Sequence, residues 1–231
     1  MSLKNLILLL AAIFYLNTGF GQETTVVKHK LTDGVTEKIS VLKSDKGIRQ
    51  GLYQAVSDEG RAVASGNFEH DKKVGVWHFY DMRGRLVQNY DYTKKQLLYE
   101  ALEDTTSNLR YFVDKILTDT DRTTKPVKPG GRYFGYIPYL KLFKLPQSLM
   151  GIDRLQSVAV IELLVSPYGR LADYKVHLYS GPTYEKVFNM NLNALNEEDK
   201  IFIPATINNE PVGCRIMIRC SIDNYGGIGF F

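Results

Sequence analysis

The clearest hydrophobic pattern lies near the C-terminal end, where apolar and polar residues alternate. One face carries Cys214, Ile216, Ile218, Cys220 and Ile222, and the other carries Arg215, Met217, Arg219, Ser221 and Asp223. A period of two with one apolar face is typical of a half-buried antiparallel strand. We therefore expect residues from about 125 onward to build a sheet and helices against that apolar face.

An apolar run from Val158 to Val165, interrupted only by Glu162, predicts a second strand. The turn residues 166–169 follow it, so residues 170–179 are expected to return as its partner. Glu162 is predicted to point to the solvated face of the sheet, with a buried acid as the alternative.

Two helices are expected in the same half of the chain. Tyr139, Leu140 and Phe143 share one helical face, which Pro138 can begin and Pro146 must end. The second helix would follow Thr183, a residue that can cap it. Its apolar face would consist of Tyr184, Val187, Phe188, Asn191, Leu192 and Leu195.

Residues 49–94 contain an internal repeat with a period of 24 residues. Each unit is predicted to be a β-hairpin, because glycine supplies the positive φ of the turn and aromatic residues pair across strands. The matched positions are Gly51, Tyr53, Gly60, Arg61, Val63 and Phe68, which recur as Gly75, Trp77, Gly84, Arg85, Val87 and Tyr92.

The flanking segments are less regular. Residues 24–44 are expected to form one or two edge strands joined at Asp33-Gly34. Residues 107–117 fit either a strand through Leu109–Val113 or an amphipathic helix from Ser107.

The second repeat unit, GVWHFYDMRG at residues 75–84, resembles the bacterial MORN-type repeat G-x-W-x-x-Y-x-x-x-G. In the first unit Tyr53 and Val56 stand at the two aromatic positions. Repeat modules usually need at least three units. Strands at residues 35–43 and 96–99 are therefore expected to cap the two units.

Residues 126–223 resemble the C-terminal domain of the TonB family. The resemblance depends on an ordered set of landmarks, with Gln156-Ser157 standing where the family commonly has glycine and Phe202 where tryptophan is usual. It implies a Gram-negative envelope protein that captures peptides. The landmarks are Pro129-Gly130-Gly131, a strand ending at Val165 before Gly169, a helix from Tyr184, Ile203-Pro204-Ala205, and Asn209 to Val212 before the last strand.

These patterns together predict an α+β protein, in which a module of antiparallel β-hairpin repeats precedes a TonB-like domain with helices on one face of a small antiparallel sheet. We expect the repeat module to span residues 22–118, a polar linker 119–125, the TonB-like domain 126–223 and a flexible tail 224–231.

The N-terminal residues 1–21 have the pattern of a cleavable secretory signal. Lys4 precedes the apolar run Leu6 to Leu16, and small residues follow up to a cleavage site after Gly21. A membrane-spanning helix needs roughly twenty apolar residues, more than this run supplies. A periplasmic protein is therefore predicted, with an uncleaved inner-membrane anchor as the alternative.

Charge and cysteine content narrow the class of partners. The net charge of +4 is small and dispersed, so nucleic acid is not an expected partner. The two cysteines lie six residues apart in one predicted strand, roughly 20 Å between Cα atoms, whereas a disulfide needs about 7 Å. They are predicted to be buried and free, while an intermolecular bridge, which would give a homodimer, and a reactive thiol remain alternatives.

No combination of residues predicts an active site. The histidines His29, His70, His78 and His177 are scattered, without the spacing of metal ligands, and no glycine-rich phosphate loop is present. His78 and His177 are expected to be exposed or hydrogen-bonded. We expect a non-enzymatic protein with no cofactor and no metal site.

The sequence-based hypothesis for function concerns the last strand. If it lies at the sheet edge, an extended peptide can add to it, with Arg215, Met217, Arg219 and Ser221 as the binding residues. The TonB resemblance implies a peptide of an outer-membrane receptor or another envelope protein as the partner. Charges on an edge strand also protect against aggregation, which is the alternative role of the arginines. The alternative function is a structural protein of the cell wall or outer membrane, which binds peptidoglycan through an aromatic repeat surface.

Overall fold

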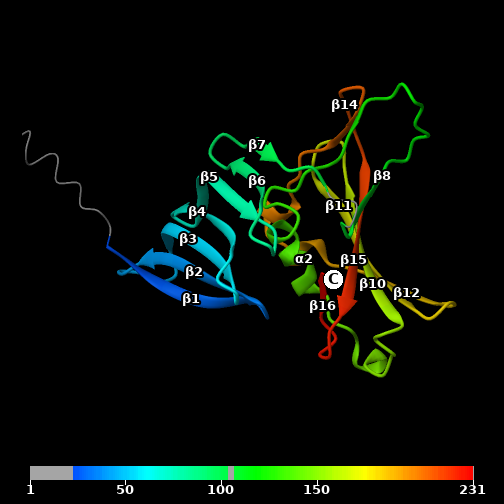
Figure 1. Cartoon of the computed structure of the whole chain (residues 1–231), viewed down its shortest axis with the longest axis horizontal. Helices are drawn as coiled ribbons and strands as arrows, with labels where there is room; N and C mark the ends of the chain where they lie inside the picture. Colours follow the sequence, from blue (N-terminus) through cyan, green and yellow to red (C-terminus); the bar gives the residue numbers. More distant parts are fainter. Residues whose placement is uncertain (1–22, 104–106, 231) are drawn as a thin grey trace, which may run out of the picture.

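The computed structural model describes residues 23–103 and 107–230, so the predicted signal lies outside the described residues. The chain is mostly β, with 52% of residues in strands that form three antiparallel sheets (Figure 1). Helical structure is short, and none of the described helices is long and apolar enough to span a membrane. The expected α+β class is therefore corrected to a mostly-β fold.

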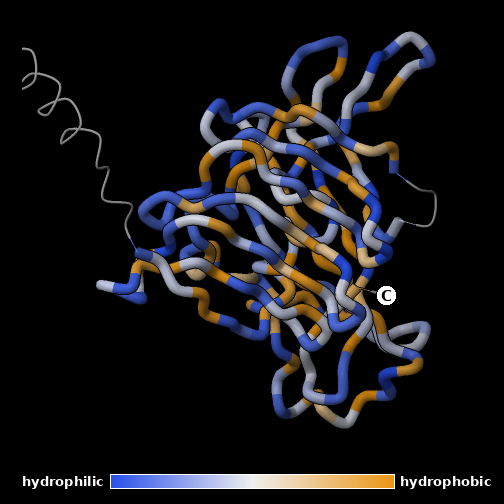
Figure 2. The backbone as a smooth tube through the Cα atoms, turned by 60° about the vertical axis from the view of Figure 1, so that its left-hand side comes forward, coloured by the Kyte–Doolittle hydropathy of each residue, from blue (hydrophilic) through white to orange (hydrophobic). Residues whose placement is uncertain are grey.

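The first sheet is a seven-stranded meander in which each strand pairs with the next along the chain. The predicted hairpin at Asp33-Gly34 is confirmed, since the two flanking strands pair from Thr24 opposite Leu42 to Thr32 opposite Val35. Hydrophobic and hydrophilic stretches alternate along these strands, as expected for a sheet with one buried face (Figure 2). The strands are β1 (Thr24–Thr32), β2 (Val35–Leu42), β3 (Arg49–Ser57), β4 (Ala62–Glu69), β5 (Lys72–Tyr80), β6 (Leu86–Asp91) and β7 (Gln96–Glu100).

The predicted repeat forms two equivalent hairpins within this meander, β3–β4 and β5–β6. The turn glycines Gly60 and Gly84 have φ angles of 79° and 78°. The Gly60 amide donates to the Ser57 carbonyl at 2.8 Å, and the Gly84 amide donates to the Asp81 carbonyl at 2.9 Å. The 24-residue period therefore corresponds to a repeated hairpin.

Trp77, the single tryptophan, is the centre of the buried face of the meander. Its ring lies 5.2 Å from the Tyr53 ring and 5.1 Å from the Phe68 ring, measured between centroids. A Cβ atom on Gly66 would come within 2.2 Å of the Trp77 ring, so glycine at this position lets the ring cross β4. The repeat aromatics are thus core residues.

The second sheet has the strand order β12-β11-β10-β15, and both β16 and β8 pair with β15. The predicted partner strands 158–165 and 170–179 are confirmed as β10 and β11. Residues 109–112 form a strand, the first of the two alternatives. The strands are β8 (Leu109–Phe112), β10 (Ser157–Val165), β11 (Leu171–Ser180), β12 (Tyr184–Asn189), β15 (Cys214–Ile222) and β16 (Ile228–Phe230).

The last long strand, β15, alternates as predicted, with its apolar residues buried. It is paired on both sides, however. One side pairs with β10 over residues 214–220, and the other with β8 over residues 215–218 and β16 over residues 220–222. The prediction that this strand is a sheet edge is wrong, because two short strands share its second side: the distant β8, and β16, which directly follows β15 along the chain.

The predicted first helix is present, and the second is wrong. α2 (Ile137–Leu142) follows the 3-10 helix η1 (Phe134–Tyr136) and ends before Pro146. Residues 184–189 form β12, which pairs with β11 after a three-residue turn at Gly181, and the short 3-10 helices η3 (Leu192–Ala194) and η4 (Glu197–Lys200) follow. The short apolar run 184–189 fits both the helical and the strand period, and pairing with the open side of β11 satisfies its backbone hydrogen bonds.

The segments expected as linker and tail both carry structure. The linker contains β9 (Thr123–Thr124), which joins β13 (Ala205–Ile207) and β14 (Glu210–Val212) in a small third sheet. The tail contains β16, so it is not a free end. Another 3-10 helix, η2 (Gln147–Leu149), follows α2.

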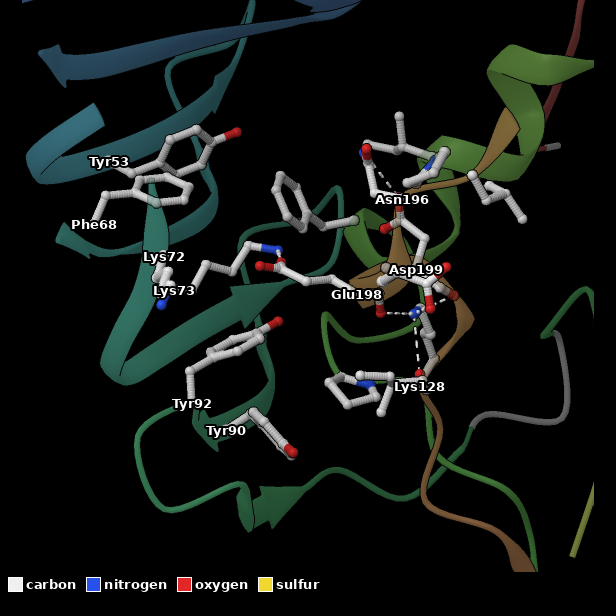
Figure 3. A pocket seen from close by; sticks show the side chains of 18 of the residues that line it. Tyr53, Phe68, Lys72, Lys73, Tyr90, Tyr92, Lys128, Asn196, Glu198 and Asp199 are labelled. Carbon is white, nitrogen blue, oxygen red and sulfur yellow. Dashed lines mark hydrogen bonds and ion pairs between the residues drawn. The ribbon is translucent and has the colours of Figure 1, made fainter. Parts of the chain in front are cut away.

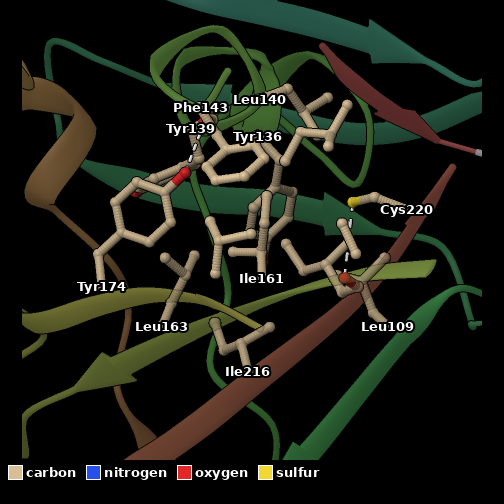
Figure 4. Packing of buried hydrophobic residues seen from close by; sticks show 14 of the residues in the cluster. Leu109, Tyr136, Tyr139, Leu140, Phe143, Ile161, Leu163, Tyr174, Ile216 and Cys220 are labelled. Atoms are coloured by element: carbon tan, nitrogen blue, oxygen red, sulfur yellow. Dashed lines mark hydrogen bonds between the residues drawn. The ribbon is translucent and has the colours of Figure 1, made fainter. Parts of the chain in front are cut away.

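A second core lies between the α2 region and the second sheet. Tyr136, Tyr139 and Phe143 face Ile161 and Ile216 in a cluster of buried residues (Figure 4). The Tyr174 hydroxyl donates to the Tyr139 carbonyl at 2.7 Å, which fixes the helix on the sheet. The segment just before α2 packs on the meander instead, through Phe134 and its neighbours.

Gln88 links the meander to the rest of the chain. Its side chain is fully buried, and its Oε1 accepts from the amides of Gly130 and Gly131 at 2.8 and 2.9 Å. Its Nε2 donates to the Lys128 carbonyl at 3.0 Å and to the Glu100 carboxylate at 2.8 Å. One carboxamide thereby satisfies three backbone groups of the segment 128–131.

We predict that Gln88→Leu lowers the free energy of unfolding by about 3–5 kcal/mol, because it leaves buried amide and carbonyl groups without partners. Denaturant unfolding followed by circular dichroism measures the loss. Gln54→Leu on the exposed face of β3 is the matched control and should change stability by less than about 0.5 kcal/mol. Equal effects of the two substitutions would contradict the special role of Gln88.

Candidate functional site

A pocket of about 800 Å³ lies between the buried face of the meander and the segments around α2 and η4 (Figure 3). Five aromatic side chains contribute to its lining: Tyr53, Phe68, Tyr90, Tyr92 and Phe134. The Tyr53 hydroxyl donates to the Glu37 carboxylate at 2.8 Å, and burial raises the pKa of Tyr53 far above its ordinary value. The pocket therefore combines an aromatic wall with polar groups from separate elements.

Two basic residues of the meander have fixed positions beside these rings. Lys73 Nζ lies 3.0 Å from a carboxylate oxygen of Glu198, which belongs to η4, and 5.1 Å from the centre of the Tyr92 ring. Arg49 pairs with Asp71 at 2.9 Å and lies over the Phe68 ring at 4.2 Å. The Lys73–Glu198 pair bridges the two walls of the pocket.

Lys128 lies at the base of the pocket and is 4% exposed. Its ammonium donates to the carbonyls of Glu198, Asp199 and Ile201 at 3.1, 2.7 and 3.1 Å. Burial lowers the pKa of Lys128 to about 7, while the negative charges of Asp199 and Glu198 oppose that shift by favouring the charged form. This lysine holds the η4 segment in place, and its three contacts leave it no free donor for a ligand.

The four predicted binding residues lie on the outward face of the second sheet, but not at an edge. Arg215 is exposed and pairs with Asp114 at 2.8 Å. Met217 is half-buried opposite Glu162, and Arg219 is exposed. Ser221 donates to the Gly229 carbonyl of β16 at 3.3 Å. The backbone of β15 is already paired on both sides, so strand addition at these residues is not available.

Polar side chains of neighbouring strands meet on the same outward face. His177 Nε2 lies 2.6 Å from a Glu162 oxygen, and His177 Nδ1 lies 3.2 Å from a Glu185 oxygen. In the meander, His78 of β5 contacts the Asn89 side chain of β6 at 2.7 Å. The predictions of two hydrogen-bonded histidines and of Glu162 on the solvated face are confirmed.

β12 is the edge strand on one side of the second sheet, and the short strands β8 and β16 lie at the opposite side. The Met190 amide donates to the Tyr174 carbonyl at 2.9 Å, which makes these two residues a hydrogen-bonded pair. Since bonded and non-bonded pairs alternate along antiparallel strands, the backbone groups of Glu185, Val187 and Asn189 point away from β11. No other strand of the described chain pairs with β12, so these groups are open to a partner.

Neither a metal-binding cluster nor an exposed cysteine thiol is found among the described residues. Within the part of the chain that the structure describes, no three His, Cys, Asp or Glu residues are grouped to hold a metal. Cys214 and Cys220 are free, as predicted, and are 2% and 0% exposed. Burial raises the pKa of Cys214 to about 11 and that of Cys220 to about 12.

No family model, curated protein or solved structure matches this chain. The resemblances to MORN-type repeats and to the TonB C-terminal domain therefore stay predictions.

Sequence patterns missed both open sites. The apolar spacing of residues 184–195 fits a helix and so conceals the edge at β12, although Gly181-Pro182 is a turn signal and Val187-Phe188 favours a strand. The pocket unites Arg49, Lys73 and Glu198, which are separated along the chain and carry no common motif. Only the fold brings such residues together.

We predict that the wild-type protein gains stability relative to Lys128→Met as the pH rises from 7. The folded pKa of about 7 lies below the unfolded value near 10.5, so the folded state binds fewer protons between these values and rising pH favours it. The expected gain is about 1–3 kcal/mol between pH 7 and 9, measured by denaturant unfolding of both proteins. A constant difference over this range would mean that the carbonyls keep the ammonium charged.

We predict that neither cysteine reacts with iodoacetamide in mildly alkaline buffer while the protein is folded, because both thiols are buried and protonated there. Both should react once the chain is unfolded in denaturant, and mass spectrometry of the labelled protein counts the modified sites. Rapid labelling of the folded protein would revive the reactive-thiol alternative.

Proposed function

We propose that this is a non-enzymatic, exported binding protein of a Gram-negative envelope, which captures an extended peptide of an envelope partner by strand addition along β12. The observation that carries the proposal is the open edge of β12, where Glu185, Val187 and Asn189 present unpaired backbone groups. Backbone hydrogen bonds to such an edge supply affinity, and alternate side chains supply selectivity.

The side chains around the edge indicate which peptides fit. Val187 is 45% exposed on the outward face, and the partly buried Phe188 packs against the core on the other face. A peptide with a β-branched or aromatic residue opposite Val187 would gain a favourable cross-strand pair. Glu185 and Lys186, both exposed, present one charge of each sign to the two faces of the added strand.

The sequence resemblances support the setting of this proposal. The landmarks in residues 126–223 resemble a TonB-like domain, which implies a peptide from an outer-membrane receptor. The pattern of residues 1–21 supports export to the periplasm. In the proposal, the MORN-like meander is the scaffold on which the peptide-binding sheet rests.

The alternative role as a wall-binding structural protein is less favoured. It requires an aromatic repeat surface that faces solvent, whereas Tyr53, Trp77 and Phe79 are at most 3% exposed. Binding to peptidoglycan would have to use other residues of the meander.

We predict that Val187→Pro removes partner capture without unfolding the protein. Proline deletes an amide that points away from β11, and an edge position of this kind tolerates proline. In pull-downs of the tagged chain from solubilised envelope, quantified by mass spectrometry, recovery of the specific partner should fall by about tenfold or more, as expected when a backbone bond and its strand geometry are lost.

Val187→Ala is the matched control, because it shortens the same side chain and keeps the amide. It should retain most of the capture, and both variants should match the wild type by circular dichroism. In the complex, the amides of Glu185 and Asn189 should become protected from hydrogen exchange. Equal capture by Val187→Pro and the wild type would exclude this edge, and capture of no specific protein by the wild type would overturn the proposed function.

A further inference from the structure

We propose that the pocket between the meander and η4 binds an anionic amphiphile, with a long-chain carboxylate as its simplest form. This site is separate from the β12 edge and does not depend on peptide capture there. The ligand class follows from three properties of the pocket: its apolar walls, its unpaired lysines and its covered ring faces.

The apolar part of the lining comes from both walls of the pocket. Leu31 and Ile39 belong to the meander, whereas Ile137, Leu142 and Leu195 belong to the α2 and η3 region. A volume of about 800 Å³ is within the usual range for sites that enclose small molecules. An alkyl chain placed between these walls would gain about fourfold in affinity for each methylene group that it buries.

Each acidic side chain of the pocket lining has a polar partner, but only Glu197 and Glu198 are paired with basic residues. Glu37 accepts from the Tyr53 hydroxyl at 2.8 Å, and Glu198 pairs with Lys73 at 3.0 Å. Glu197 pairs with Arg170 and Lys200 at 2.6 and 2.7 Å, and its pKa is lowered by those contacts. The Asp199 carbonyl accepts a hydrogen bond from Lys128, and its carboxylate lies 3.4 Å from the side-chain amide of Asn196. Six basic side chains line the pocket against these four acidic ones, so the balance of charge favours an anionic ligand over a cationic one.

The basic groups, in contrast, include three without a counter-charge. Lys72 begins β5, Lys95 lies in the turn before β7, and Lys141 lies in α2, and all three are exposed. None of them forms an ion pair with any of the residues 23–103 or 107–230. Three lysines from separate segments thus border one cavity with uncompensated positive charge, which favours an anionic group at the opening.

Two hydroxyls add to this donor set. Tyr90 and Tyr92 both line the pocket, and neither hydroxyl has a hydrogen-bond partner in the described chain (Figure 3). Phenol hydroxyls and ammonium groups both donate to carboxylate oxygens. The two hydroxyls therefore add to the three lysines as groups that can donate to an anion.

The aromatic rings favour an alkyl chain over a sugar. A sugar needs an open ring face, but the Tyr53 ring is covered by Phe68, Trp77 and Phe134 at centroid distances of 5.6, 5.2 and 5.9 Å. Tyr53, Phe68 and Tyr90 are at most 6% exposed. Ring edges remain available, and these suit apolar contact with a chain.

Trp77 supplies a direct readout of binding. It is the single tryptophan, and its ring contacts three pocket-lining residues, Tyr53, Phe68 and Tyr92. We would titrate the full chain with dodecanoate, dodecanol and dodecyltrimethylammonium, and follow Trp77 fluorescence together with the melting temperature. Dodecanoate should bind saturably and about tenfold or more tighter than dodecanol, the gain expected from charge-assisted contacts, and the cationic probe should bind weakest.

The lysines are tested with the triple variant Lys72→Gln, Lys95→Gln, Lys141→Gln. It should lose the preference for dodecanoate and keep the weak binding of dodecanol. Lys144→Gln is the control, because Lys144 is also exposed and follows α2 but does not line the pocket. Octanoate and decanoate should bind progressively more weakly than dodecanoate, by about fourfold per methylene.

Two results would overturn the proposal: the absence of any saturable response to dodecanoate, or the same preference for dodecanoate in the wild type and the triple variant. Circular dichroism of the triple variant establishes that it is folded. Val187→Pro should bind dodecanoate like the wild type, so a failure of this pocket and a failure of the β12 edge are distinguished.

Discussion

The buried carboxamide of Gln88 is the contact on which the packing of the meander against the rest of the chain depends. A meander with one apolar face needs a cover, and the cover here is the loop before α2, whose backbone amides would be unsatisfied against an apolar sheet. Gln88 provides both a donor and acceptor at that point, so the loop can be buried. This attachment positions the ring of Phe134 and the ammonium of Lys128, which both form part of the pocket. The pocket is thus a consequence of how the meander is attached to the rest of the chain.

Local patterns predicted the elements whose stability is local. The 24-residue repeat, the hairpin at Asp33-Gly34 and the strand pair around Glu162 depend on glycine turns and alternation that can be recognised in the chain itself. The helix predicted from Tyr184 is wrong for a physical reason. The apolar spacing of residues 184–189 fits both the helical and the strand period, and only the open side of β11 decides between them. Pro129-Gly130-Gly131 forms the turn that its residue types favour, but its burial against Gln88 depends on the fold of the whole chain.

The candidate sites were even less accessible to sequence reasoning than the fold. The alternation in β15 identified correctly which side chains face outward, yet alternation contains no information about which strands lie on either side. Position in a sheet is a property of the whole chain, because β8, which covers part of one side of β15, comes from a segment about a hundred residues earlier. The strand proposed to bind a peptide is therefore β12, not β15. Likewise, the charge balance of the pocket depends on which lysines find acidic neighbours, and Lys73 does so only through contact with η4.

The sharing of one side of β15 between β8 and β16 sets an order for folding. β10 and β11 can pair as soon as both are made, since a short turn joins them. Residues 109–112 of β8, however, have no strand to join until residues 215–218 exist, about a hundred positions later in the sequence. Such a distant closure is slow, because the entropy of the intervening loop must be lost before the contact forms. The second sheet should consequently form as a β10–β11 hairpin first, and its β8 side should close only when synthesis of the chain is almost complete.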